Sequence, residues 1–117
     1  MRTALTIAIL LFALPLCAAS KKERALDLAV YAASELDGAT TYAALRDCGS
    51  RCYEANPFMQ PVASTPAIFP VMALGAVGVN YLAQRLRTRH GRIAFALQGA
   101  VIGVHLFAGE HNLTAAQ

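Results

Sequence analysis

Two long stretches without charge dominate the C-terminal half of the chain. No charged residue lies between Glu54 and Arg85, and within this stretch residues 67–83 are apolar apart from Asn80 and the Tyr81 hydroxyl. A second uncharged run follows a short basic segment. About 20 predominantly apolar residues suffice to cross a bilayer as a helix. The pattern therefore predicts two transmembrane helices, at 66–84 and 93–111.

The segment between these two helices, residues 85–92, is rich in arginine. Short loops with several basic residues stay on the cytoplasmic side of a membrane. The segment therefore predicts a cytoplasmic turn that joins the two helices into a hairpin. The residues expected to set this topology are Arg85, Arg87, Arg89 and Arg92.

The front half predicts a further helix at 25–46, which contains no proline and many alanine and leucine residues. Ser34, Asp37 and Thr41 form a polar stripe along it at helical spacing. Each acidic residue at a bilayer centre costs about 3 kcal/mol, so this helix needs an interface or partner helices. The pattern leaves open whether it lies on the outer surface or crosses the membrane.

Residues 1–19 have the features of a secretory signal: one arginine, an apolar run and a small-residue exit after Ala19. The alternative is a signal anchor that is not cleaved, because Lys21, Lys22 and Arg24 outweigh the single Arg2. Both readings place the loop 47–61 and the C-terminus outside. The expected location is the inner membrane of a bacterium.

The composition agrees with a small membrane domain formed by residues 20–117. The chain has 117 residues, of which 56% are hydrophobic, which is more than soluble domains usually carry. The net charge of +3 does not indicate nucleic-acid binding, because the basic residues cluster at the expected membrane edges. The expected fold class is all-α: a small membrane helical bundle of three to four helices, including the N-terminal signal-like helix and the C-terminal transmembrane hairpin.

Cysteine spacing predicts one disulfide. Cys48 and Cys52 lie close together in the expected outer loop, and exported chains commonly pair such cysteines. Free thiols are the alternative. No further cysteine pair could complete a four-sulfur zinc site.

Glycines at helical spacing predict close packing between helices. Gly99 and Gly103 form a G-x-x-x-G pattern in the last helix, and Gly75 belongs to a similar small face in the preceding one. The alternative is that small residues are simply frequent in membrane helices. The pattern does not say whether such faces join helices of one chain or of two.

Polar residues converge on the outer end of the expected bundle. Such groups persist at membrane depth only when they pair or line a cavity. We expect a polar or ligand-binding cluster there, formed by Asp37, Thr41, Glu54, Asn56, His105, His111 and Asn112. Asn80 is expected near the opposite end. The alternative is a purely structural role, in which Asn56 and Glu54 only cap a helix start and His105 is a hydrogen-bonded core residue.

The segments Asp37-Gly38-Ala39-Thr40-Thr41, Glu54-Ala55-Asn56-Pro57 and His111-Asn112 carry a resemblance. They resemble an uncharacterised family of small bacterial multi-helix membrane proteins, which share D-x-x-[ST]-T and E-x-N-P motifs. The resemblance covers roughly residues 30–112. The chain departs from it in the CGSRC sequence before Glu54. Because that family has no established activity, the resemblance implies a fold and no function.

The leading functional hypothesis is a structural or partner-binding membrane protein that contacts lipid and itself or a larger membrane complex. The alternative is a metal- or proton-handling protein or accessory transport subunit, with Asp37, Glu54 and His105 as candidate ligands of a transition metal. A second alternative is an exported soluble helical protein. No catalytic motif is present, so neither an enzyme nor a cofactor is predicted.

Overall fold

The computed structural model describes residues 20–115, and these residues form helices and no strand. The elements are α2 (Lys21–Cys48), the short 3₁₀ turn η1 (Gly49–Arg51), the one-turn helix α3 (Gln60–Ala63) and the long helix α4 (Ile68–Ala115). The all-helical expectation is confirmed. The expected signal segment at 1–19 lies outside the described residues.

α2 begins and ends at strong local signals. The Ser20 hydroxyl accepts a hydrogen bond from the backbone N–H of Glu23 at 3.3 Å, and the Glu23 carboxylate accepts one from the Ser20 N–H at 2.6 Å. This reciprocal capping box satisfies two of the free N–H groups of the first turn. The helix ends at Gly49, whose φ of 61° favours a residue without a side chain.

α4 changes direction at a single residue. His90 has φ −137° and ψ 54°, so residues 68–89 form a first arm and residues 91–115 form a second arm. The sequence interpretation treated 85–92 as a turn, whereas the structure keeps most of it helical. Arginine, leucine and threonine are compatible with a helix, and only the bend before Gly91 interrupts it. The two arms therefore form a helical hairpin whose non-helical connection is the single residue His90, instead of the eight-residue turn expected at 85–92.

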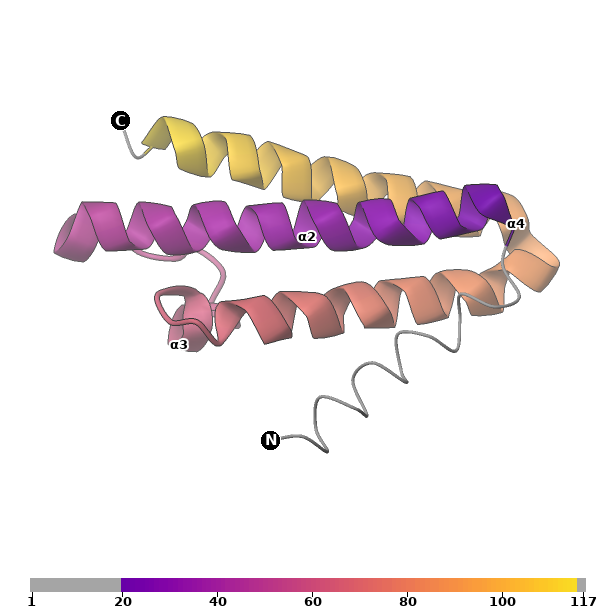
Figure 1. The fold of residues 1–117 in the computed structure, drawn as a ribbon, viewed down its shortest axis with the longest axis horizontal. Coiled ribbons are helices and arrows are strands. Elements are labelled where there is room, and N and C mark those ends of the chain that lie inside the picture. The colour runs from indigo at the N-terminus through magenta and orange to yellow at the C-terminus, as the bar shows by residue number, and fades with distance from the viewer. Residues whose placement is uncertain (1–19, 116–117) are drawn as a thin grey trace.

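α2 packs along both arms of α4, and the three segments run roughly side by side (Figure 1). The N-terminal end of α2 lies beside the bend of α4, which we call the bend end. The C-terminal end of α2, the loop with η1 and α3, and the end of the second arm lie at the opposite end, the loop end. α2 therefore spans the full length of the α4 hairpin.

Small residues allow close approach between these segments. A Cβ atom at Gly38 would lie 3.1 Å from Met72 Cγ of the first arm, and one at Gly109 would lie 3.5 Å from Thr40 Oγ1 of α2. The edge of the Tyr42 ring also meets Phe69, with centroids 5.9 Å apart. The glycines at 38 and 109 therefore bring α2 close to both arms.

Candidate functional site

The buried face of α2 is polar or small rather than apolar. Its buried residues are Asp27, Val30, Ala33, Ser34, Asp37, Gly38, Thr40 and Thr41. A soluble protein would place Leu, Ile and Phe at such positions, since these types are most often buried. Buried polar groups must instead be satisfied by hydrogen bonds. In the described part of the chain, most of these polar groups belong to two hydrogen-bonded networks, and the Ser34 hydroxyl belongs to neither.

The first network joins α2 to the second arm near the loop end, and we call it the outer network. His105 Nδ1 lies 2.8 Å from Asp37 Oδ2, and the two side chains are 23% and 12% exposed. Asn112 Nδ2 donates to Thr41 Oγ1 at 2.7 Å and to Asp37 Oδ1 at 3.3 Å. Thr41 Oγ1 in turn donates to Asp37 Oδ1 at 3.3 Å. The Asp37 carboxylate is the centre of this network.

The outer network contains four of the seven residues expected to cluster, namely Asp37, Thr41, His105 and Asn112. In this network the Asp37 carboxylate is bonded by side chains of its own helix and of the second arm, which is compatible with a structural or a ligand-binding role. An ionised carboxylate only accepts, so His105 Nδ1 carries the hydrogen in this contact when Asp37 is charged. With Asp37 charged, the imidazole is thus a donor toward α2.

Glu54 and Asn56 have a local capping role. Glu54 Oε1 accepts a hydrogen bond from the Asn56 N–H at 2.8 Å, and Asn56 Oδ1 accepts one from the Phe58 N–H at 3.0 Å. The Asn56 carbonyl then accepts from the N–H groups of Met59 and Gln60. This arrangement is the capping interpretation of the E-x-N-P segment.

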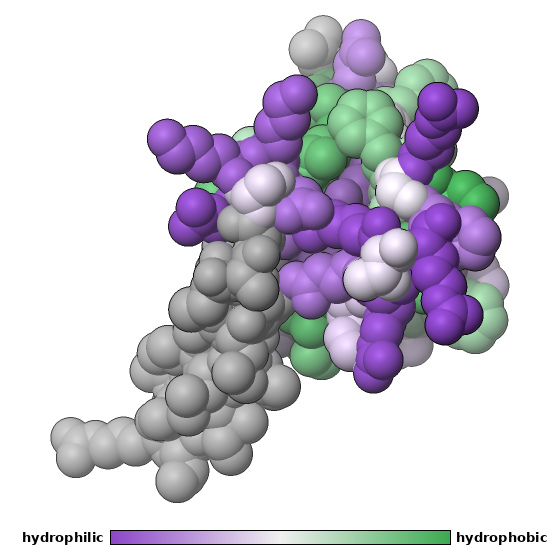
Figure 2. Space-filling view, turned by 90° about the vertical axis from the view of Figure 1, so that its right-hand side faces the viewer, coloured by the Kyte–Doolittle hydropathy of each residue, from purple (hydrophilic) through white to green (hydrophobic). Residues whose placement is uncertain are grey.

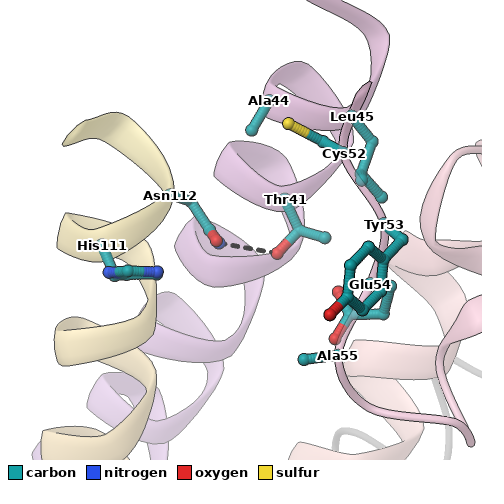
Figure 3. Close-up of a pocket in the computed structure, with 9 residues that line it drawn as sticks. All are labelled: Thr41, Ala44, Leu45, Cys52, Tyr53, Glu54, Ala55, His111 and Asn112. Carbon is teal, nitrogen blue, oxygen red and sulfur yellow. Dashed lines mark hydrogen bonds between the residues drawn. The ribbon is translucent and has the colours of Figure 1, made fainter. Parts of the chain in front are cut away.

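A cavity of about 180 Å³ lies at the loop end above the outer network, and we call it the outer cavity. Figure 3 shows Thr41 of α2 between His111 and Asn112 of α4 on one side and Tyr53, Glu54 and Ala55 of the loop on the other. The Thr41–Asn112 hydrogen bond borders the cavity. Glu54 and His111 thus belong to the wall of the outer cavity, while the Asp37 carboxylate lies behind it.

The three candidate metal ligands are not arranged as one site. Asp37 and His105 are in contact, whereas Glu54 bonds to the backbone of its own loop. Within residues 20–115 no group of three or more His, Cys, Asp or Glu side chains could hold a metal ion. The outer network is therefore a carboxylate–imidazole pair with amide and hydroxyl partners.

The second network, the inner network, lies toward the bend end and joins all three segments. Asp27 Oδ1 accepts from Arg87 Nη2 and from Gln98 Nε2, both at 2.8 Å. Gln98 also accepts from Arg87 at 3.0 Å and donates to Asn80 Oδ1 at 2.9 Å. Asn80 Nδ2 donates to the Asp27 carbonyl at 3.1 Å. Asp27, Asn80 and Gln98 are only 4%, 3% and 0% exposed.

Sequence reasoning missed this inner network. Asn80 was expected away from the outer network, and the structure agrees, but its partners were not anticipated. The available signal was that Asp27, Asn80 and Gln98 each interrupt or border an apolar helix. Polar residues of this kind, when buried between helices, usually have hydrogen-bond partners on the facing helices. Arg87, expected only to set topology, also supplies the charge that faces Asp27.

The bend end carries a concentration of basic side chains. Figure 2 looks onto this end and shows hydrophilic side chains projecting from it. The residues that contribute positive charge here are Lys21, Lys22, Arg24, Arg85, Arg87, Arg89 and Arg92. Arg85 also lies over the Tyr81 ring, with its guanidinium carbon 5.3 Å from the ring centroid. The basic start of α2 thus joins the basic residues of α4.

The glycines expected at a helix interface are exposed. Nothing lies within 4 Å of a Cβ atom built at Gly75, Gly99 or Gly103. Within the described chain, close packing uses Gly38 and Gly109 instead. The G-x-x-x-G face of the second arm therefore remains open.

Cys48 and Cys52 form a close pair at the end of α2. Their sulfur atoms are joined as a disulfide and their Cα atoms are 5.6 Å apart, within the usual range for such bonds. The pair closes the loop around η1, and Cys52 lines the outer cavity. It thereby holds the loop against α2.

Comparison of the chain with family models, characterised proteins and solved structures gave no match. The resemblance described above therefore stays a prediction, and function must be argued from the geometry.

Proposed function

We propose that the chain is a small integral membrane protein, a three-helix bundle of structural or partner-binding function in the bacterial inner membrane. The observation that supports this proposal most is that polar side chains are buried and large apolar side chains are exposed, the reverse of what a soluble protein usually shows. Buried positions include Asp27, Asn80 and Gln98, whereas many large hydrophobic side chains are exposed. These exposed residues include Leu28, Leu36, Leu74, Tyr81, Leu82, Ile93, Phe95, Val104, Leu106, Phe107 and Leu113.

Lipid makes this arrangement favourable. A soluble monomer rarely exposes such an extensive apolar surface, and an exported soluble protein would have the opposite pattern. One described helix, Ile68–Thr114, is long and apolar enough to cross a membrane. Its two arms, at 1.5 Å per residue, are roughly 33 Å and 37 Å long, which matches a hydrocarbon core of about 30 Å.

The charge distribution supports a cytoplasmic bend end. Seven of the lysine and arginine residues of α2 and α4 gather there, whereas Arg46 and Arg51 lie at the loop end. This excess of basic residues at the bend end is what the positive-inside rule expects of a cytoplasmic side. In this topology α2 crosses outward and the loop with Cys48 and Cys52 lies outside. A cleavage site after Ala19 would then face the cytosol, away from signal peptidase, so residues 1–19 act as a retained anchor.

Reporter fusions test this topology. Fusions after residues 20 and 88 should report the cytosol, and a fusion after residue 50 should report the outside. Intact mass of the purified protein should include residues 1–19. An outside signal at residue 20 with loss of those residues would contradict the proposed crossing of α2. Extraction of the protein by carbonate would contradict membrane insertion altogether.

The open glycine face supports a partner-binding role. Gly99 and Gly103 make no close contact within the described chain, yet such patterns let helix backbones approach one another. The partner is a second copy or a helix of a larger complex. Cross-linking in membranes should trap an adduct that Gly99→Leu lowers and Gly78→Leu, on the first arm, leaves unchanged. Equal adduct with both variants would argue against this face.

A ligand-handling role is the second candidate, and the Asp37–His105 contact at 2.8 Å favours it. Carboxylate and imidazole can both exchange protons or bind a transition metal. Stoichiometric metal binding that His105→Ala abolishes would favour the metal version. A variant that only lowers thermal stability would favour a structural role for the pair.

A further inference from the structure

The Ser34 hydroxyl is the one buried side-chain polar group in the described chain that lacks a hydrogen-bond partner. Its residue is 1% exposed and lies on the buried face of α2. A helical serine usually bonds to the carbonyl four residues earlier, but this contact is not made here. An unsatisfied buried hydroxyl costs about 1–3 kcal/mol. This cost indicates a role other than holding the bundle together.

Ser34 lies at the midpoint of a continuous row of exchangeable side chains. The row consists of Asp27, Tyr31, Ser34, Asp37 and Thr41, which follow each other at intervals of three or four residues. Neighbours at this spacing share one helix face, with Cβ atoms about 5–6 Å apart. One water molecule can bridge hydroxyl and carboxylate oxygens across such a gap. From Asp27 to Thr41 the row covers 14 helical steps, or roughly 21 Å along the helix axis.

At each end of this row, a side chain lies next to a cavity or to a partly exposed group. At the loop end, Thr41 contacts Asp37 Oδ1 and also lines the outer cavity. At the bend end, Asp27 contacts Arg87, which is 14% exposed on its side chain. Tyr31 lies between Ser34 and Asp27 and interacts with Asn80 of the inner network. The Ser34 hydroxyl has no direct hydrogen bond to a neighbour on either side.

We propose that this row of α2 conducts protons between the outer cavity and the bend end, with the Asp37–His105 pair as its proton-binding site. The proposal rests on the membrane bundle proposed above and specifies the ligand-handling candidate. A proton enters at Thr41 and is held between Asp37 Oδ2 and His105 Nδ1. It continues by way of Ser34 and bridging water to Tyr31 and the inner network.

The steps balance without any further reactant. Each hydroxyl and each bridging water accepts one proton and releases another, and a carboxylate that takes up a proton releases it to the next member of the row, so only O–H and N–H bonds form and break. The basic side chains in contact with the row are His105 from the second arm and Arg87 from the first arm. Arg87 is itself paired with Asp27 at 2.8 Å and lies 3.7 Å from Glu23. These acids offset the positive charge that would otherwise repel a proton at the bend end.

The test is proton flux into liposomes that contain the full chain and a pH-sensitive dye, driven by a potassium diffusion potential. Wild-type protein should acidify the lumen faster than protein-free liposomes. Ser34→Ala should lower this rate at least tenfold while the unfolding midpoint stays equal or rises, because the lost hydroxyl has no partner. Asp37→Asn should also lower the rate. Thr88→Ala, which removes an exposed hydroxyl bonded to its own helix, is the matched control and should conduct normally.

Two outcomes would overturn the proposal. One is wild-type flux equal to that of empty liposomes although the protein resists carbonate extraction from them; the membrane bundle would then stand without conduction. The other is normal flux through Ser34→Ala, because a purely structural row does not depend on that hydroxyl. Protein that leaves the liposomes in carbonate would instead refute the membrane proposal on which this inference rests.

Discussion

Removing the Arg87 side chain tests whether the inner network stabilises the bundle. Arg87→Ala deletes a guanidinium that donates to Asp27 Oδ1 at 2.8 Å and to Gln98 Oε1 at 3.0 Å. The Asp27 residue is 4% exposed, so its carboxylate would keep a buried charge with Gln98 as the remaining donor. Breaking a buried ion pair by removing one partner costs 3–5 kcal/mol. We expect about 3 kcal/mol, since the Arg87 side chain retains 14% exposure.

Arg85→Ala is the matched control for this variant. It removes the same charge from the same helix end, but the Arg85 guanidinium interacts with the exposed Tyr81 side chain, donating to its hydroxyl at 2.9 and 3.1 Å and lying over its ring. The expected change is within about 0.5 kcal/mol. Equilibrium denaturation in detergent, followed by the helical circular dichroism signal, gives both values. Asp27→Asn combined with Arg87→Ala should recover part of the loss. Equal stability of Arg87→Ala and Arg85→Ala would refute the assigned role of the network.

Two further predictions use the glycines and the helix start. Gly38→Leu should lower the free energy of unfolding by about 1–3 kcal/mol, because its Cβ would lie 3.1 Å from Met72 Cγ, whereas Gly99→Leu should leave the monomer's stability nearly unchanged. Equal losses in detergent denaturation would contradict this. Hydrogen bonds from the Ser20 backbone and then its hydroxyl lower the pKa of Glu23 below 4.5. The stability from this carboxylate is therefore present above pH 4.5 and lost as the pH falls through the folded pKa, and Glu23→Gln should reduce this acid dependence; parallel stability curves from pH 6 to pH 3 would argue against it.

The positions of the helices followed from local pattern. The helix expected at 25–46 corresponds to α2 at Lys21–Cys48, and the one expected at 93–111 falls within the second arm of α4. The helix expected at 66–84 overlaps the first arm, which begins two residues later, at Ile68. Apolar runs and capping residues act over a few neighbouring positions, so a sequence displays them directly. The backbone conformation of the basic segment 85–92 was harder to predict, because its charges indicate membrane topology but do not specify whether the backbone remains helical.

The partners of the polar residues did not follow from local pattern. Gln98 meets Asp27 and Asn80, which are 71 and 18 residues away in sequence. Such contacts depend on how each helix is rotated about its axis. Asp37 and His105 were expected at one end because topology alone brought them there. Glu54 was expected beside them as well, but its carboxylate is used by the adjacent Asn56 N–H, a local bond that competes with any distant one.

The close approach at Gly109 and the outer network depend on each other. In lipid, apolar contact between helices gives little net drive, so packing and hydrogen bonding must hold the segments together. A Cβ atom at Gly109 would meet Thr40 Oγ1 at 3.5 Å and the Asp37 Cα at 3.9 Å. The second arm can therefore approach α2 closely at this turn, and His105 and Asn112, on either side of Gly109, both reach Asp37. The glycine provides the distance at which the polar side chains bond, and those bonds in turn retain the close contact.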